Sequence, residues 1–130
     1  MSQQPVELIL VRHLASRLEV PVFVVDAAGD LVYFNEPAEH VLGRRFDEIR
    51  SMPFDEWTTA FLPSAEGRQL AVERLPLVIA LRTGVPAHSA FEITGGDGVT
   101  RSIEATAFPL FAPGHQQLGA VAMFWESETR

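Results

Sequence analysis

Hydrophobic residues recur at helical spacing at the start of the chain. Between Val6 and Glu19 one apolar stripe follows the helix axis, while charged and polar side chains fall elsewhere around it. The stripe consists of Val6, Leu10, Val11, Leu14 and Leu18. The pattern predicts an N-terminal amphipathic helix, which we assign to residues 1–19.

Two further apolar residues, Leu8 and Ile9, lie off that stripe. The first two turns are therefore apolar around more of their circumference than packing against one surface requires. This surplus predicts a second contact, which a twin subunit would provide. The expected homodimer interface consists of Leu8, Ile9, Val11 and Leu14.

Strand-like patterns begin after Pro21, where the helix is expected to end. Two runs of β-branched and aromatic residues, 22–25 and 31–34, flank a turn that contains Asp26 and Gly29. This arrangement predicts a β-hairpin.

Short helices are predicted in the middle of the chain. Asn35 suits a helix N-cap and Gly43 a left-handed C-terminal position, so a short helix is expected between them. Prolines and glycines then interrupt the pattern. The remaining helical pieces are expected at 46–49, 54–61 and 76–82.

Alternation returns after Pro86 and predicts three antiparallel strands, at 88–94, 101–111 and 118–125. The last strand is apolar on both faces, so neither face of the sheet centre can be fully exposed to water. The predicted fold class is α+β. A five-stranded antiparallel sheet carries short helices on one face, and the N-terminal helix or a partner covers the other.

Composition supports one domain and narrows the chemistry. The 130 residues are 47% apolar, enough for a core without metals or disulfides. A formal net charge of −7, without a basic and aromatic patch, argues against nucleic acid as a partner. The absence of cysteine excludes disulfides, thiolate zinc sites and cysteine nucleophiles. No apolar run approaches the ~20 residues of a membrane span, and no signal peptide is recognised, so a cytoplasmic protein is expected.

The ordered set of segments resembles the PAS family, whose members are sensory modules in histidine kinases, cyclases and transcription regulators. Residues 21–35, PVFVVDAAGDLVYFN, followed by Ala38 and Leu42-Gly43, resemble the family's first hairpin, its asparagine and its first short helix. The segment from Pro76 to Gly84 resembles the long helix and exit glycine, and 97–121 the closing hairpins. The resemblance implies a PAS domain over residues 20–126, with a C-terminal tail at 127–130.

The family resemblance implies a sensory or interaction module, not an enzyme. It does not identify a ligand, because family members bind haem, flavins, small acids, fatty acids or nothing at all. In many relatives the last strand leads into a signalling helix and an effector domain. An effector domain or effector protein is therefore an expected partner.

Haem and flavin are both disfavoured. Haem-binding relatives usually take the axial histidine from the long helix, and residues 76–82 contain none. His40 and His88 are the histidines that can face a pocket, as iron ligands or as titrating groups. Relatives of the light-oxygen-voltage type form a flavin adduct through a cysteine, which this chain lacks.

Enzymatic signatures are sparse. The sequence contains no nucleophile elbow, P-loop, zinc-protease or dinucleotide motif, and its four histidines form no pair at i, i+3 or i+4. An enzyme would need an acid such as Asp26 or Glu104 in an apolar cavity as a general base. The glycine-rich segment 95–98 lies between two strands, where a turn explains it better than a phosphate site.

A small apolar ligand is expected between the helical segment and the sheet. Large side chains of the helices face small ones of the sheet there, which leaves room for a cavity. The alternative is that the same aromatic residues fill an ordinary core. The candidate ligand-binding residues are Asn35, His40, Phe46, Met52, Trp57, Phe61, Leu77, Leu81, Phe91, Ile93 and Ala105.

The predicted function is that of a sensory signalling module, as found in bacterial-type signal transduction or transcription regulation. Binding of a ligand or partner would change how the short helices pack on the sheet and bias the geometry of a homodimer. The alternative is a purely structural dimerisation module with a filled core and no ligand.

Overall fold

The computed structural model describes residues 5–127. Residues 1–4 of the predicted N-terminal segment and 128–130 of the predicted tail lie outside this range. Six helical elements are present among the described residues: α1 (Val6–Ala15), α2 (Glu36–Leu42), α3 (Phe46–Ile49), α4 (Phe54–Ala60), the 3₁₀ helix η1 (Val72–Arg74) and α5 (Pro76–Thr83). The strands are β1 (Val22–Asp26), β2 (Leu31–Phe34), β3 (Ser64–Ala65), β4 (Arg68–Gln69), β5 (Ala87–Thr94), β6 (Thr100–Phe111) and β7 (Gln117–Glu126).

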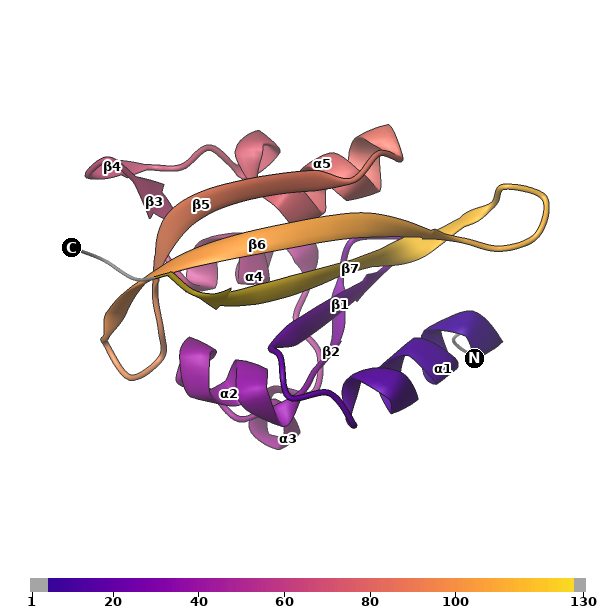
Figure 1. The fold of residues 1–130 in the computed structure, drawn as a ribbon, viewed down its shortest axis with the longest axis horizontal. Coiled ribbons are helices and arrows are strands. Elements are labelled where there is room, and N and C mark those ends of the chain that lie inside the picture. Colours follow the sequence, from indigo (N-terminus) through magenta and orange to yellow (C-terminus); the bar gives the residue numbers. More distant parts are fainter. Residues whose placement is uncertain (1–4, 128–130) are drawn as a thin grey trace.

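All strands join one antiparallel sheet in the order β2-β1-β7-β6-β5-β3-β4 (Figure 1). The five long strands are the predicted ones, and the fold class is confirmed. The predicted count of five was too low, because two two-residue strands extend the edge beside β5. Glu66 and Gly67 both have positive φ and form the tight turn between β3 and β4. Sequence patterns rarely reveal strands this short.

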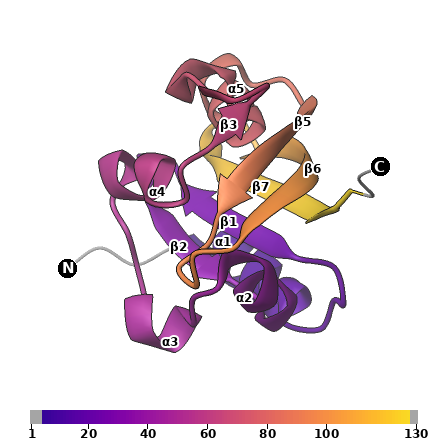
Figure 2. The same cartoon turned by 90° about the vertical axis from the view of Figure 1, so that its left-hand side faces the viewer.

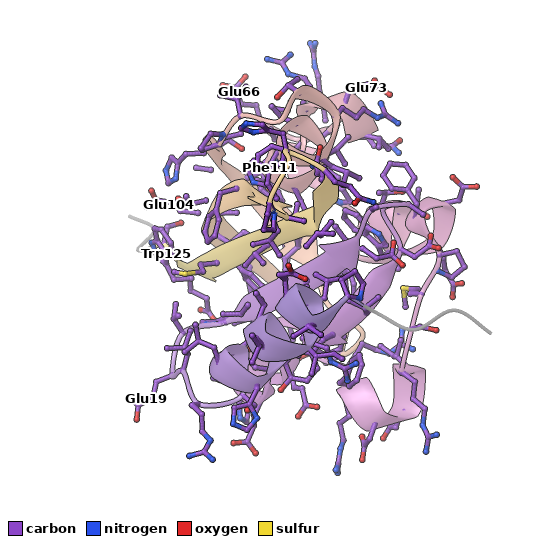
Figure 3. The ribbon with its side chains drawn as sticks, turned by 90° about the vertical axis from the view of Figure 1, so that its right-hand side faces the viewer. Glu19, Glu66, Glu73, Glu104, Phe111 and Trp125 are labelled. Carbon is purple, nitrogen blue, oxygen red and sulfur yellow. The ribbon has the colours of Figure 1, made fainter. Side chains whose placement is uncertain are left out.

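The sheet has an apolar core on each face. The larger core lies between the sheet and α2, α4 and α5, with α3 and η1 packed against its edge. The smaller core lies beneath α1, on the side that Figure 3 views. Figure 2 views the opposite end, with α3 and α4 beside the sheet. The prediction that neither face of the sheet centre is exposed is therefore confirmed.

Helix α1 packs through a different face from the predicted stripe. The buried positions of the helix are Leu8 and Ala15, and Val11 and Leu18 pack beside them. Val6, Leu10 and Leu14 instead point to solvent. The apolar residues surround so much of the helix that two stripes are compatible with the sequence, and spacing alone cannot choose between them. The helix also ends at Ala15, four residues before Glu19.

Asn35 joins the two sides of the molecule. Its Oδ1 accepts the backbone N–H groups of Val22 (3.0 Å) and Ala38 (3.1 Å), the second of which caps α2. Its Nδ2 donates to the carbonyls of Ala15 and Val20, both at 2.9 Å. This one buried side chain therefore connects the end of α1 and the starts of β1 and α2.

The β1–β2 turn holds α4 in place. The backbone N–H of Phe54 donates to Asp30 Oδ1 (2.9 Å) at the start of the helix. The indole Nε1 of Trp57 donates to the carbonyl of Gly29 (2.7 Å). Two separate hydrogen bonds therefore fix α4, which carries one wall of the site described below.

The β5–β6 turn docks on the C-terminal end of α2. The N–H of Gly96 donates to the carbonyl of Leu42 (2.8 Å), and Arg101 donates to the carbonyl of Val41 (3.0 Å). A Cβ atom on Gly95 would lie 2.6 Å from the Leu42 carbonyl oxygen. The turn was predicted correctly. Glycine is needed at position 95 because the backbone passes close to α2, and its φ is not positive.

Candidate functional site

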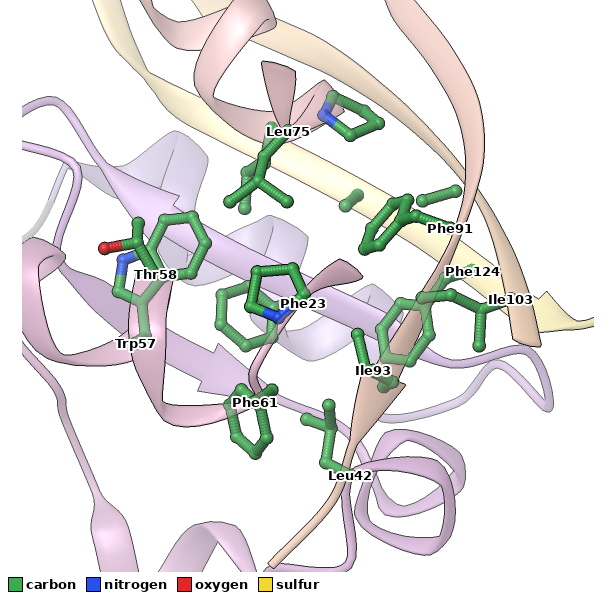
Figure 4. Close-up of a pocket in the computed structure, with 15 residues that line it drawn as sticks. Phe23, Leu42, Trp57, Thr58, Phe61, Leu75, Phe91, Ile93, Ile103 and Phe124 are labelled. Carbon is green, nitrogen blue, oxygen red and sulfur yellow. The ribbon is translucent and has the colours of Figure 1, made fainter. Parts of the chain in front are cut away.

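An apolar cavity of about 80 Å³ lies between the helices and the inner face of the sheet (Figure 4). Its walls come from β1, α2, α4, the segment after α4, α5 and strands β5, β6 and β7. The lining residues are Phe23, Leu42, Trp57, Thr58, Phe61, Pro63, Leu75, Pro76, Leu77, Phe91, Ile93, Ile103, Ala105, Ala122 and Phe124.

Strand alternation places the sheet side of this lining. On β6, Ile103 and Ala105 point inward, and on β7 Ala122 and Phe124 do the same. Ala105 pairs with Phe124 across the two strands. The two alanines leave the space that the cavity occupies, because larger side chains surround them.

The polar atoms of the lining side chains are already hydrogen-bonded. Only Trp57 and Thr58 carry such atoms. The indole donates to Gly29, and Thr58 Oγ1 donates to the Phe54 carbonyl (2.8 Å). In Figure 4 both polar atoms lie on the side away from Phe91 and Ile103. The interior of the cavity is therefore a hydrocarbon surface.

Six of the predicted ligand-binding residues line the cavity: Trp57, Phe61, Leu77, Phe91, Ile93 and Ala105. The predicted set omitted Phe23, Ile103, Ala122 and Phe124, although alternation along β1, β6 and β7 places them on this face. Leu42, Thr58, Leu75 and the two prolines were also missed. They belong to short helices and connections whose facing direction has no strong sequence signal.

The other five predicted residues lie outside the cavity. Asn35 and Met52 are buried in structural roles, Met52 in a bridge to Leu31. Phe46 packs against Tyr33 and Phe34, and Leu81 lies near Gly29 at the edge of the core. His40 is exposed on α2, beside a shallow charged surface.

The candidate ionisable groups also lie away from the cavity. His88 is exposed on the outer face of the sheet, 3.2 Å from Glu104 and 2.7 Å from Thr106. Asp26 accepts two backbone N–H groups within the β1–β2 turn. Among residues 5–127 no cluster of three potential metal-ligating side chains occurs.

The cavity does not fit haem or flavin as it stands. Sites for ligands of that size typically occupy about 300–1,000 Å³, and this space is about 80 Å³. No histidine lines it to ligate iron.

The outer surface of α1 is apolar. Val6, Ile9, Leu10 and Leu14 are each more than half exposed. Of the four predicted interface residues, Ile9 and Leu14 lie on this surface, and Val11 is half-buried. Leu8 is 0% exposed and packs on the sheet of its own chain.

An antiparallel sheet with a ring of short helices over one face, a terminal helix on the other and an apolar cavity between defines a class of small sensory domains. A family model described as the PAS fold matches residues 15–130, and the chain belongs to this family. Among the described residues no helix combines the length and apolar character needed to cross a membrane.

Solved structures of PAS domains share this fold. The PAS domain of Bordetella pertussis BvgS is 18% identical with a TM-score of 0.64, and the match covers 95% of this chain and 88% of that one. The PAS domain of nitrogen regulation protein NR(II) from Vibrio parahaemolyticus is 16% identical with a TM-score of 0.62, covering 91% and 98%. A Rhodobacter sphaeroides LOV protein is 14% identical with a TM-score of 0.73, covering 94% and 68%. No curated protein matches the chain.

PAS domains are sensory or interaction modules of signalling proteins, and one of the similar structures comes from a two-component sensor histidine kinase.

Proposed function

We propose that this chain senses a small ligand in the apolar cavity and signals as a homodimer. The cavity carries the proposal, because its walls come from both the helices and the sheet. A molecule that binds there contacts α4, α5 and the central strands together. Occupancy would therefore favour one packing of helices on the sheet over another.

The central strands offer a route from the cavity to α1. Phe23 of β1 lines the cavity, and its neighbour Val24 packs in the core beneath α1. On β7, Ala122 also lines the cavity, and its neighbour Val121 packs in the core beneath α1. A shift of either strand changes both surfaces, and Asn35 adds a direct link from α2 to the end of α1. An effector domain or effector protein would receive the resulting change.

The exposed apolar surface of α1 supports the dimer. A second copy of the chain would cover Ile9, Leu10 and Leu14, which otherwise contact water. The double substitution Ile9→Glu with Leu14→Glu should convert a dimer to a monomer in sedimentation velocity. Val85→Glu adds a charge at an equally exposed apolar residue between α5 and β5 and should leave the dimer intact. A dimer that survives the double substitution would contradict this interface.

Native mass spectrometry with an absorbance spectrum of the purified protein tests the ligand and the subunit number together. A co-purified small molecule in a dimer is the expected result. An empty monomer would contradict homodimeric signalling. An empty dimer would favour the second candidate, a structural dimerisation module, for which the α1 surface is the supporting observation.

A cytoplasmic location is part of the proposal. Fractionation of cells that express the full natural protein tests it, and recovery with the membrane or exported fraction would contradict it.

A further inference from the structure

We propose that the cavity selects uncharged, wholly apolar molecules between xenon and benzene in size. This inference rests on the proposed ligand-sensing function and narrows it to one chemical class. It follows from the chemistry of the walls, the volume between them and the packing around them.

The walls give a polar ligand no free side-chain hydrogen-bond donor. No charged residue, histidine, asparagine or glutamine is among the fifteen that line the cavity. Trp57 Nε1 donates its only proton to Gly29, and the Thr58 hydroxyl donates to Phe54 and lies on the outer side of the cavity. Pro63 and Pro76 have no backbone N–H to offer. A ligand carboxylate would be buried without a counter-charge, which disfavours small acids strongly.

The volume sets an upper size. The cavity measures about 80 Å³, roughly half of the ~150 Å³ apolar cavity that is known to stay dry and to bind benzene or xenon. Xenon and short hydrocarbons are therefore the expected ligands, and benzene needs a small outward movement of the walls. Haem and flavins exceed this space, and a fatty acid could place only part of its chain in it.

Two alanines keep the space open. Ala105 and Ala122 face the cavity from neighbouring strands, and both are buried. Ala107 also points inward on β6 and is completely buried, but it does not line the cavity. The three positions therefore provide a cavity-filling substitution at two sites and a matched control at the third.

Binding can be followed in the full chain by methyl correlation NMR. The reporters are the methyl groups of Leu42, Leu77, Ile93 and Ile103, which line the cavity. Xenon under pressure and benzene should shift these signals saturably. Phenol has the same ring with one hydroxyl and should bind at least about tenfold more weakly than benzene, because its hydroxyl finds no partner. Acetate should cause no shift at these methyls.

Ala105→Val should abolish the xenon shifts by filling the cavity, and Ala122→Val should do the same from β7. Ala107→Val adds an equal volume at a residue that pairs with Ala122 but does not line the cavity, so it should keep the xenon shifts even if its Tm falls from overpacking. Equal loss of xenon binding in all three variants would overturn the assignment to this cavity.

The outcomes separate the two proposals. If acetate or phenol shifts the cavity methyls while xenon and benzene do not, the apolar class is wrong and ligand sensing stands. If no probe shifts them, both the ligand class and the ligand-sensing function are contradicted.

Discussion

Asn35 connects more segments of the chain by hydrogen bonds than a helix cap requires. Four hydrogen bonds from one buried amide join segments from Ala15 to Ala38. Asn35→Ala should lower the free energy of unfolding by about 2–4 kcal/mol, since it removes a helix cap and leaves buried backbone groups unpaired. Denaturant unfolding measures this change.

Asn35→Ser separates the two functions of the amide. Serine can still cap α2, but its shorter side chain carries one donor and cannot replace both bonds to Ala15 and Val20. We expect an intermediate stability and faster hydrogen exchange of the α1 amides. Equal stability of the alanine and serine variants would contradict a role for the Nδ2 hydrogen bonds.

Asp97 provides a pH-dependent contribution. The hydrogen bond from Arg101 is the main cause that holds the pKa of this carboxyl below its usual value, and the Val99 N–H adds to it. Because the folded pKa is the lower one, the contribution is complete above the unfolded pKa near ~3.9 and is lost as pH falls through the folded value. Asp97→Asn should therefore lower the Tm at pH 7, and the difference should shrink as pH falls below the unfolded pKa.

Asp47→Asn is the matched control. Asp47 also lies beside an arginine, 3.3 Å from Arg45, but both side chains are mostly exposed. Such a pair contributes little to stability, so its Tm should not change. A Tm difference for Asp97→Asn that does not shrink as pH falls below the unfolded pKa would contradict the ionic origin.

Individual residues were predictable where one local rule decides their role. The Asn35 cap and the Gly43 and Gly84 helix ends follow from backbone requirements and were predicted. The three further hydrogen bonds of Asn35 were not, because their partners lie thirteen, fifteen and twenty residues away. Distant pairing leaves no periodic signal in the sequence.

At the scale of elements, α1 shows how periodicity can identify a helix and still assign its faces wrongly. Leu8→Ala should destabilise the protein by about 2–4 kcal/mol, because Leu8 is 0% exposed beneath the helix. Leu10→Ala makes the same chemical change at a residue that is 62% exposed and should cost little in a monomer. Thermal unfolding at low protein concentration compares the two. A larger effect of Leu10→Ala would contradict the packing through Leu8 and favour the apolar stripe that the sequence predicted.

The elements of the cavity differ in how well the sequence predicted them. Strands β5 and β6 have long alternating patterns, so Ile93 and Ala105 were predicted to face the cavity. Strand β7 is apolar on both faces, and its inward residues were omitted from the predicted set. The segment between α4 and α5 instead contains a two-residue hairpin and a 3₁₀ turn. Its contributions to the lining, Pro63 and Leu75, depend on tertiary packing and could not be read from spacing.

At the scale of the whole molecule, the sheet is shared between two cores. One core includes the cavity and the other supports α1, and β1 and β7 contribute to both. The α+β class and the antiparallel pairing of the strands followed from the sequence of patterns along the chain. The size and dryness of the cavity did not, because a small void depends on how many distant side chains meet.

The chain's two tryptophans lie on opposite sides of this sheet. Trp57 lines the cavity and is 7% exposed, whereas Trp125 lies on the outer face beside His88 and is 38% exposed. Their fluorescence should therefore differ in colour, with blue-shifted emission from Trp57 and red-shifted emission from Trp125. Replacing either one by phenylalanine leaves a natural optical probe of a single face. A ligand signal that crosses the sheet would then be visible as a delayed change in Trp125 emission after the change in Trp57.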